Sequence, residues 1–304
     1  MTWLPALVAA AVLATSPAAA SCIALERGDE GTPIIRASIN GTEPLAFVLD
    51  TAASGTTIDP AVAKRLALPN ESGTQTAQGM GGGIDVVLHR ILSLRAGPIN
   101  AQDLSVPALP APDFRSHAVA GLAGIDVFGK QMAVWAPRDN CVLVLANGTP
   151  LRDGTWHNAR ANWVQPWKIM VPVRIGRVDG WALLDTGAQY TTLNPRFAER
   201  LGLDVAKLKP AGAIAGIDGR ELQLREARLD HARVGPWRWT SPTVRVGALP
   251  VFERLAMAGD TLAILGMDWL SDRRFAIDYG NRSVWLSASQ AAPASHRQAE
   301  MSRR

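Results

Sequence analysis

The sequence has few of the residues on which metal and nucleophile chemistry depends. Of 304 residues only five are histidine and two are cysteine, Cys22 and Cys141, and neither cysteine has a Cys or His partner at the spacing of a zinc site. The motifs H-E-x-x-H and G-x-S-x-G are both absent. Neither a P-loop nor a dinucleotide-binding glycine pattern follows a strand in a βαβ context. We therefore expect no metal and no other cofactor.

Concentrated positive charge and long hydrophobic runs are also lacking. The formal net charge is +4 with no run rich in Lys or Arg, which argues against a nucleic-acid partner. The apolar run over residues 4–14 is too short to span a bilayer, and no other segment approaches spanning length without charges. We expect no transmembrane segment in the mature chain, while 47% hydrophobic residues provide ample material for a core.

The beginning of the chain indicates an export signal. Residues 1–20 carry no charged side chain, contain that apolar run and end in three alanines, small residues suited to cleavage before Ser21. We predict a signal peptide over residues 1–20 and an exported protein, periplasmic or secreted. In an oxidising compartment two cysteines suggest a Cys22–Cys141 disulfide. The alternative is a lipoprotein signal, with Cys22 acylated as a lipid anchor and Cys141 a buried free thiol.

The chain contains an internal repeat. Residues 47–58 read Phe-Val-Leu-Asp-Thr-Ala-Ala-Ser-Gly-Thr-Thr-Ile, and residues 182–193 read Ala-Leu-Leu-Asp-Thr-Gly-Ala-Gln-Tyr-Thr-Thr-Leu. Farther along, Leu-Ala-Gly-Ile-Asp-Val-Phe at 122–128 matches Ile-Leu-Gly-Met-Asp-Trp-Leu at 264–270. Each Asp-Thr pair thus follows an apolar segment and precedes an apolar-Gly-x-Asp element, which makes a chance match of three residues a poor explanation.

The parts of each copy follow one another in the same order. Alternating segments at 33–39 and 170–175 predict strands, and a second apolar strand runs into each Asp-Thr turn. Asp59-Pro60 and Asn194-Pro195 predict the starts of short helices. Glycine-rich hairpins follow, and closing hairpins with turns at 137–140 and 279–281 end each copy. Short strands separated by turn signals predict a mainly β architecture.

The repeat defines the expected domains. We predict an N-terminal lobe over residues 31–147, a linker over 148–167, a C-terminal lobe over 168–287 and a disordered tail over 288–304. The linker contains Trp156, Trp163 and Trp167. Because buried aromatic residues contribute much packing area, we expect these residues to pack the linker onto one lobe or into the seam between lobes.

The two motif pairs resemble those of pepsin-like and retropepsin-like aspartic proteases, with both lobes fused in one chain. The pairs are Asp50-Thr-Ala-Ala-Ser54 with Leu122-Ala-Gly124, and Asp185-Thr-Gly-Ala188 with Ile264-Leu-Gly266. The element at 264–270 is especially similar to the retroviral and retrotransposon versions, and the resemblance covers about residues 31–287. It implies a bilobal, pseudo-two-fold acid-protease fold of two β-barrel-like lobes with short helices.

The resemblance implies an aspartic endopeptidase that acts on peptide or protein substrates, with Asp50 and Asp185 as catalytic residues. The physical argument agrees: two carboxylates about 3 Å apart cannot both ionise, so the pair holds one proton over a broad pH range. One carboxyl group can then draw a proton from water while the other donates to the scissile carbonyl. Because one chain supplies both groups, we expect a monomer rather than an enzyme that must dimerise.

Further residues take supporting roles by the same resemblance. Thr51 and Thr186 would hydrogen-bond across the seam, and Gly124 and Gly266 would let a loop pass tightly beneath each aspartate. We expect Asp126 and Asp268 to be structural. The remaining candidates are Ala52 and Gly187 in the catalytic turns, and flap residues Gly79, Met80, Gly81, Gly82, Gly83, Ile214, Gly216 and Ile217.

Three departures from the pepsin pattern leave a second hypothesis open. Ala52 replaces the usual glycine, and Ala53 and Ala188 stand where pepsins commonly have Ser. Neither flap shows the Tyr typical of pepsin flaps, which favours the retropepsin branch. Fewer donors to the carboxylates predict higher pKa values for the pair than in a pepsin. Ala52 and the first flap favour the rival hypothesis, a catalytically weak peptide-binding protein that retains the fold.

Overall fold

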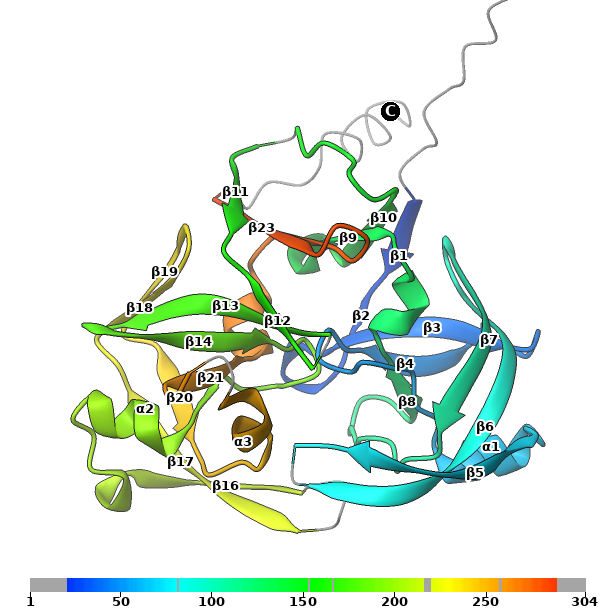
Figure 1. Cartoon of the computed structure of the whole chain (residues 1–304), viewed down its shortest axis with the longest axis horizontal. Helices are drawn as coiled ribbons and strands as arrows, with labels where there is room; N and C mark the ends of the chain where they lie inside the picture. The colour runs from blue at the N-terminus through cyan, green and yellow to red at the C-terminus, as the bar shows by residue number, and fades with distance from the viewer. Residues whose placement is uncertain are drawn as a thin grey trace, which may run out of the picture.

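The computed structural model describes residues 21–80, 82–152, 154–165, 167–215, 220–256 and 259–288. Within these residues the strands form three sheets: one from each repeat, and a third that takes strands from both (Figure 1). The predicted signal peptide, the predicted tail after Ala288, and the flap residues Gly81, Gly216 and Ile217 lie outside the described residues.

The first repeat forms a seven-stranded sheet. Two antiparallel strands at its centre are the alternating segment and the apolar strand that leads into the first Asp-Thr turn, with Ile34 opposite Val48. The strands lie in the order β5 (Asn70–Gln78), β6 (Gly83–Ala96), β3 (Pro33–Ile39), β4 (Leu45–Leu49) and β8 (Val119–Ala123), with β2 (Glu26–Arg27) beside β3 and β7 (Ile99–Pro107) beside β6.

The second repeat forms a ten-stranded sheet that follows the same plan. Its central antiparallel pair places Met170 opposite Leu183, as Ile34 lies opposite Val48 in the first sheet. The order is β16 (Lys209–Ala215), β17 (Glu221–Arg228), β20 (Thr243–Val246), β15 (Thr192–Leu193), β21 (Leu262–Leu265), β14 (Val178–Leu184), β13 (Lys168–Ile175), β18 (His231–Val234) and β19 (Trp237–Thr240), with β12 (Asn162–Val164) beside β13.

The third sheet joins the lobes. The closing hairpins of the two repeats pair with each other, and Trp135 stacks on Phe275 across that junction with ring centroids 5.5 Å apart. Both rings are fully buried, so this sheet also carries part of the core. Its order is β1 (Ser21–Ala24), β10 (Cys141–Leu145), β9 (Met132–Ala136), β22 (Phe275–Asp278), β23 (Ser283–Ser287) and β11 (Trp156–Ala159).

The two predicted helix starts are both present. The Asp59 carboxylate accepts the backbone N–H of Ala61 at 2.8 Å and caps α1 (Pro60–Arg65). The Asn194 side chain accepts the N–H of Phe197 at 2.9 Å and caps α2 (Pro195–Arg200). The other helical segments are η1 (Asp29–Gly31), η2 (Ile125–Phe128), η3 (Pro137–Asp139), η4 (Val205–Lys207), α3 (Val251–Leu255) and α4 (Met267–Leu270).

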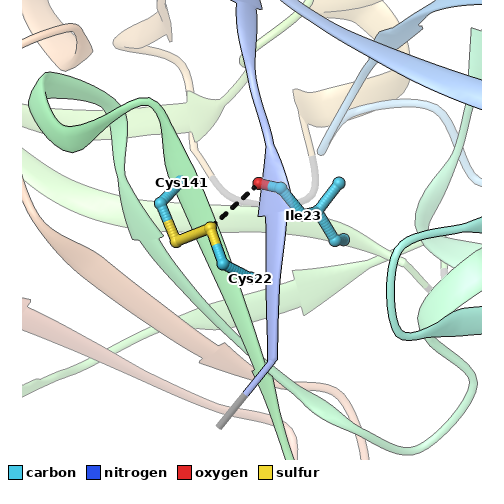
Figure 2. The surroundings of a disulfide bond; sticks show 3 residues. All are labelled: Cys22, Ile23 and Cys141. Carbon is cyan, nitrogen blue, oxygen red and sulfur yellow. Dashed lines mark hydrogen bonds between the residues drawn. A yellow bond between two sulfur atoms is a disulfide. The ribbon is translucent and has the colours of Figure 1, made fainter. Parts of the chain in front are cut away.

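A disulfide joins Cys22 on β1 to Cys141 on β10, with the two Cα atoms 5.7 Å apart (Figure 2). The Cys22 sulfur also lies 3.4 Å from the carbonyl oxygen of Ile23. A bonded sulfur carries no hydrogen, so this is a packing contact. The bond connects residues 119 positions apart and fastens the first described strand to the sheet between the lobes.

The segment predicted as a linker contributes two strands. β11, which begins at Trp156, pairs with β23 in the sheet between the lobes, and β12 pairs with β13. Trp163 lies edge-on to Tyr279 with ring centroids 6.3 Å apart, and the Arg282 guanidinium lies over its ring. The tryptophans thus attach this segment to the seam, while its exact boundaries stay a prediction. The mainly β, two-lobed fold predicted from the repeat is confirmed.

Candidate active site

The two aspartates of the repeat lie at equivalent ends of two strands. β4 ends at Leu49 and β14 at Leu184, and each is followed by an aspartate. Each aspartate is held by the parallel neighbouring strand: the Asp50 N–H donates to the Ala123 carbonyl at 3.0 Å, and the Asp185 N–H donates to the Leu265 carbonyl at 3.2 Å. The apolar-Gly-x-Asp elements at 122–128 and 264–270 therefore lie beside the aspartates because they begin on β8 and β21.

Glycine is required directly after each of these neighbouring strands. A Cβ atom on Gly124 would lie 2.6 Å from the Gly55 carbonyl oxygen, and one on Gly266 would lie 2.9 Å from the Tyr190 carbonyl oxygen. These distances are too short for a methyl group beside backbone atoms, so neither loop can carry a side chain where it passes the aspartate turn.

Thr51 and Thr186 link the two turns. The Thr51 N–H donates to the Thr186 hydroxyl at 3.0 Å, and the Thr186 N–H donates to the Thr51 hydroxyl at 3.1 Å. Each hydroxyl in turn donates to a carbonyl of the opposite lobe, Thr51 to Leu184 at 2.9 Å and Thr186 to Leu49 at 2.7 Å. Both threonines are buried, so the four bonds fix the two turns against each other without competition from water.

The arrangement brings the two carboxyl groups into direct contact. Asp50 and Asp185 share a side-chain hydrogen bond. Each also accepts two backbone N–H groups: Asp50 from Ala52 at 2.7 Å and Ala53 at 3.2 Å, and Asp185 from Gly187 at 3.0 Å and Ala188 at 2.9 Å.

Burial raises the pKa of both carboxyl groups. For Asp50 the loss of solvent outweighs the backbone donors and the neighbouring charge of Lys168. For Asp185, which is only 5% exposed, burial and the nearby Asp50 carboxylate raise the pKa to about 8. A pair of this kind keeps one proton up to near-neutral pH, because both groups cannot ionise together in so confined a site.

The two Asp-Thr turns differ at one position. A Cβ atom on Gly187 would lie 2.5 Å from Asp50 Oδ2, so the second turn has no room for a side chain there. The first turn carries Ala52 at the matching position, and its methyl group is buried in an apolar cluster that includes Val164, Met170 and Leu183. Ala52 therefore faces a space that Gly187 lacks.

The family comparison agrees with this geometry. A model of the aspartyl protease family matches residues 35–127 and again residues 171–269, one match for each repeat. The chain belongs to the aspartyl protease family. A search of curated proteins found no match. The two matched regions contain both Asp-Thr turns, both threonines of the link and both apolar-Gly-x-Asp elements.

Asp126 and Asp268 support the aspartyl protease turns from beneath. Asp126 accepts the Thr56 N–H and the Thr56 hydroxyl, both at 2.8 Å. Asp268 accepts the Thr191 N–H at 2.8 Å and its hydroxyl at 2.7 Å. The threonines sit at matching positions, six residues after each aspartate of the pair, a correspondence that the repeat in the sequence already contains. Burial raises the pKa of both supporting carboxyl groups, that of Asp268 to about 6.

The glycine-rich segments lie at hairpin ends. The first connects β5 to β6 through Gly79, Met80 and Gly82, and Gly83 begins β6; Gly82 has a φ of +148°. Ile214 lies near the end of β16 in the second hairpin. Met80 and Ile214 pack against the apolar cluster that contains Ala52, so hairpins from both lobes contribute side chains to this cluster.

The first hairpin also touches the opposite lobe. The Val251 N–H at the start of α3 donates to the Met80 carbonyl at 3.2 Å, and the Arg254 guanidinium donates to the Gly79 carbonyl. This contact could not be predicted from the repeat, because α3 has no counterpart in the first repeat. The contact ties the hairpin of one lobe to a helix of the other.

Lys168 is the charged residue of the site that sequence reasoning missed. It begins β13, and its ammonium group donates to the Ala52 carbonyl. The only available signal was a lysine directly before an apolar strand, a common pattern at strand ends.

In the described residues, no three His, Cys, Asp or Glu side chains form a cluster suited to a metal ion. Of the described helices, none is long and apolar enough to cross a membrane.

Proposed function

We propose that the chain is an exported, single-chain aspartic endopeptidase that hydrolyses peptide bonds in peptide or protein substrates. Asp50 and Asp185 are the catalytic residues, and a water molecule held between them is the nucleophile. The observation that carries the proposal is the contact of two carboxyl groups, one from each lobe, of which Asp185 is buried and Asp50 is partly exposed. The two groups share a hydrogen bond, and both have raised pKa values.

The chemistry follows from the single proton that the pair holds. The ionised carboxyl group takes a proton from water, and the resulting hydroxide attacks the scissile carbonyl carbon. The protonated carboxyl group donates its proton to the carbonyl oxygen, which forms a tetrahedral diol. One carboxyl group then donates a proton to the amide nitrogen while the other takes a proton from a diol hydroxyl. The C–N bond breaks to give an amine and a carboxylic acid, and the pair is left with one proton as at the start. The proton belongs to the pair, so neither aspartate is assigned a fixed role.

Supporting roles follow from the contacts. Thr51 and Thr186 hold the two turns together, Gly124 and Gly266 allow the close loops, and Ala52 and Gly187 shape the turns around the carboxyl groups. The hairpin residues, among them Gly79, Met80 and Ile214, are proposed to cover bound substrate, because glycine-rich hairpins can open and approach a ligand closely. Because both aspartates come from one chain, the active species is proposed to be a monomer.

The proposed location rests on the disulfide. A bond between Cys22 and Cys141 favours an oxidising environment and therefore export, with the periplasm or the exterior as the destination. Bonded in this way, Cys22 has no free thiol for acylation, so the bridge supports the exported soluble form over the lipid-anchored alternative.

A second candidate function is a peptide-binding protein with little or no catalysis. One observation favours it: the Ala52 methyl group lies in the first turn, where the matching position of the second turn is Gly187. In this alternative the site would bind a peptide without cleaving it.

A peptide-library assay separates the two candidates. Mature wild-type protein should cleave a defined subset of peptides, pepstatin should inhibit it, and Asp50→Asn and Asp185→Asn should each abolish cleavage. Both variants should stay folded, since replacing one carboxylate relieves like-charge crowding. Circular dichroism and thermal unfolding serve as the folding control. Binding without cleavage by the wild type would support the second candidate, and full activity in either variant would contradict the catalytic assignment.

A further inference from the structure

Lys168 is a cation that the mechanism above does not use. It lies at the first position of β13, directly after the segment that connects the lobes, and is only partly exposed. Its ammonium group donates to the carbonyl of Ala52, two residues after Asp50. A lysine held in this way by a backbone carbonyl keeps its charge in one place beside the carboxyl pair.

The hydrogen bond reaches the carboxylate through one peptide group. The Ala52 carbonyl and the Ala53 N–H belong to the same peptide unit, and that N–H donates to Asp50 Oδ1 at 3.2 Å. A charge on the carbonyl oxygen polarises the peptide and strengthens its N–H as a donor, because linked hydrogen bonds reinforce one another. Lys168 therefore acts on Asp50 both directly through space and through this peptide.

The position has no charged counterpart in the first lobe. Lys168 lies two residues before Met170, which is opposite Leu183. Thr32 lies two residues before Ile34, which is opposite Val48 in the first sheet. The pseudo-two-fold axis thus relates Lys168 to the buried Thr32. Lys168 therefore places a positive charge on one side of the carboxyl pair that has no equivalent on the other side.

The charged groups around Lys168 come from three elements. Asp50 and Asp185 in the catalytic turns attract the ammonium group, and Arg254 on α3 repels it. Arg254 is itself partly offset by Glu253 and donates to the Gly79 carbonyl. Tyr279 behind the pair stays neutral, because burial and the Asp50 charge raise its pKa. The balance leaves the carboxyl pair as the main partner of the lysine.

We propose that Lys168 is a positioning residue of this active site, one that supplies a fixed positive charge to the Asp50–Asp185 pair and orients the first catalytic turn through the Ala52 carbonyl. The role of Lys168 in catalysis rests on the proposed function. Its effect on the titration of the two carboxyl groups can be tested without measuring catalysis. The charge stabilises the ionised state of the pair, so its removal shifts both protonation steps to higher pH. Burial lowers the pKa of the lysine itself, and the charges of Asp50 and Asp185 act in the opposite direction.

The test is a direct titration of the pair in the mature, disulfide-bonded protein. Protein labelled with 13C at the aspartate carboxyl carbon is followed by NMR from pH 3 to pH 9, and Asp50→Asn and Asp185→Asn assign the two signals. Lys168→Met removes the charge and the hydrogen bond, Lys168→Gln removes the charge and can keep a donor, and Lys168→Arg keeps the charge. Lys207→Met is the matched control, because Lys207 lies exposed on η4 and pairs with Asp204.

In the Met and Gln variants we expect the pair to titrate about one pH unit higher than in wild type, as for loss of an adjacent opposite charge. Lys168→Arg and Lys207→Met should titrate like wild type. If wild type cleaves peptides, the acid limb of its kcat/KM profile should move by the same amount in the neutral variants, with rescue by Arg. A merely structural lysine would lower activity at every pH and leave the limbs in place.

The outcomes separate this inference from the proposed function. Unchanged titration of the pair in both folded neutral variants would overturn the role of Lys168, even if the wild type is an active protease. A shifted titration in the neutral variants, together with a wild type that cleaves no peptide, would support the role of Lys168 and contradict the endopeptidase. If the Met variant does not fold, the comparison of Gln with Arg decides, since those two variants differ in charge while both can donate to Ala52.

Discussion

Thr51 and Thr186 are each other's hydrogen-bond partners across the junction of the two lobes. Each N–H donates to the other's hydroxyl, and each hydroxyl donates to the carbonyl that directly precedes the opposite aspartate. The aspartate positions therefore depend on contacts from the opposite lobe as well as on those of their own lobe. The same contacts that dock the two lobes therefore also bring the two carboxyl groups together.

Thr186→Val tests this link. Valine has nearly the shape of threonine but cannot accept the Thr51 N–H or donate to the Leu49 carbonyl, and a buried group left without a partner costs about 1–3 kcal/mol. We expect the free energy of unfolding to fall by about 3 kcal/mol in urea titrations with the disulfide intact. Thr186→Ser, which keeps the hydroxyl, should lose about 1 kcal/mol or less. Equal stabilities for the two variants would show that the link contributes little.

The unequal turns give a second prediction. In Gly187→Ala the new methyl group would meet Asp50 Oδ2 at 2.5 Å, so the Asp50 carboxylate must move away from its partner. A misplacement of about 1 Å can reduce a rate about 100-fold, and we expect a loss of that order in kcat/KM on a peptide substrate.

Ala52→Gly is the matched control for that substitution. It removes a methyl group from the same position of the other turn and should leave kcat/KM within about tenfold of wild type, because no catalytic group depends on that methyl. Gly187→Ala protein that is as active as wild type would contradict the steric argument. A large loss in Ala52→Gly would instead show that the Ala52 methyl positions the turn.

Much of this architecture follows from the sequence, because duplicated motifs imply duplicated geometry. The Asp-Thr pairs, the later glycines and the caps at Asp59 and Asn194 could all be predicted, since each depends on neighbours a few residues away or on its copy in the other half. Lys168 could not be predicted in the same way. Its partner Ala52 is 116 positions away and the lysine has no equivalent in the first repeat, so neither local pattern nor symmetry indicates the contact.

The sheet between the lobes shows the same limit. The closing hairpins were predicted from their turns, but the pairing of β9 with β22 depends on how the lobes dock, as do the additions of β1 and β11 at the two edges. Contacts that arise only from docking, such as those of Met80 with Val251, carry no signature in either partner alone.

The disulfide gives a third prediction. Non-reducing mass spectrometry of the mature protein should show one peptide pair that links Cys22 to Cys141. Because the bond closes a loop of 119 positions, the Cys22→Ser, Cys141→Ser double variant should lose up to about 4–5 kcal/mol of unfolding free energy in the chain-entropy picture. A diacylglycerol adduct on Cys22 would contradict the bridge and place the protein at a membrane surface.

The carboxyl pair makes the fourth prediction, a pH–rate profile displaced from that of strong-acid proteases. Apart from the hydrogen bond that Asp50 and Asp185 share, four backbone N–H groups donate to them, and the alanines at 53 and 188 provide no hydroxyl. Burial raises the pKa of both carboxyl groups, that of Asp185 to about 8. The active form of the pair carries one proton. Raising the pKa of both protonation steps therefore moves both limbs of the pH–rate profile to higher pH.

We therefore expect kcat/KM on a peptide substrate to peak in mildly acidic solution, about pH 4–6, with a basic limb that extends toward neutral pH. The raised pKa of Asp185 also makes the free energy of unfolding depend on pH. A carboxyl group with a raised pKa binds its proton more tightly when folded, so its contribution is complete below the unfolded pKa and is lost as pH rises toward 8. Asp185→Asn cannot ionise and should lose less stability than wild type between pH 4 and pH 8 in urea unfolding. A rate maximum below about pH 3, or equal pH dependence of stability in the two proteins, would show that Asp185 does not retain its proton.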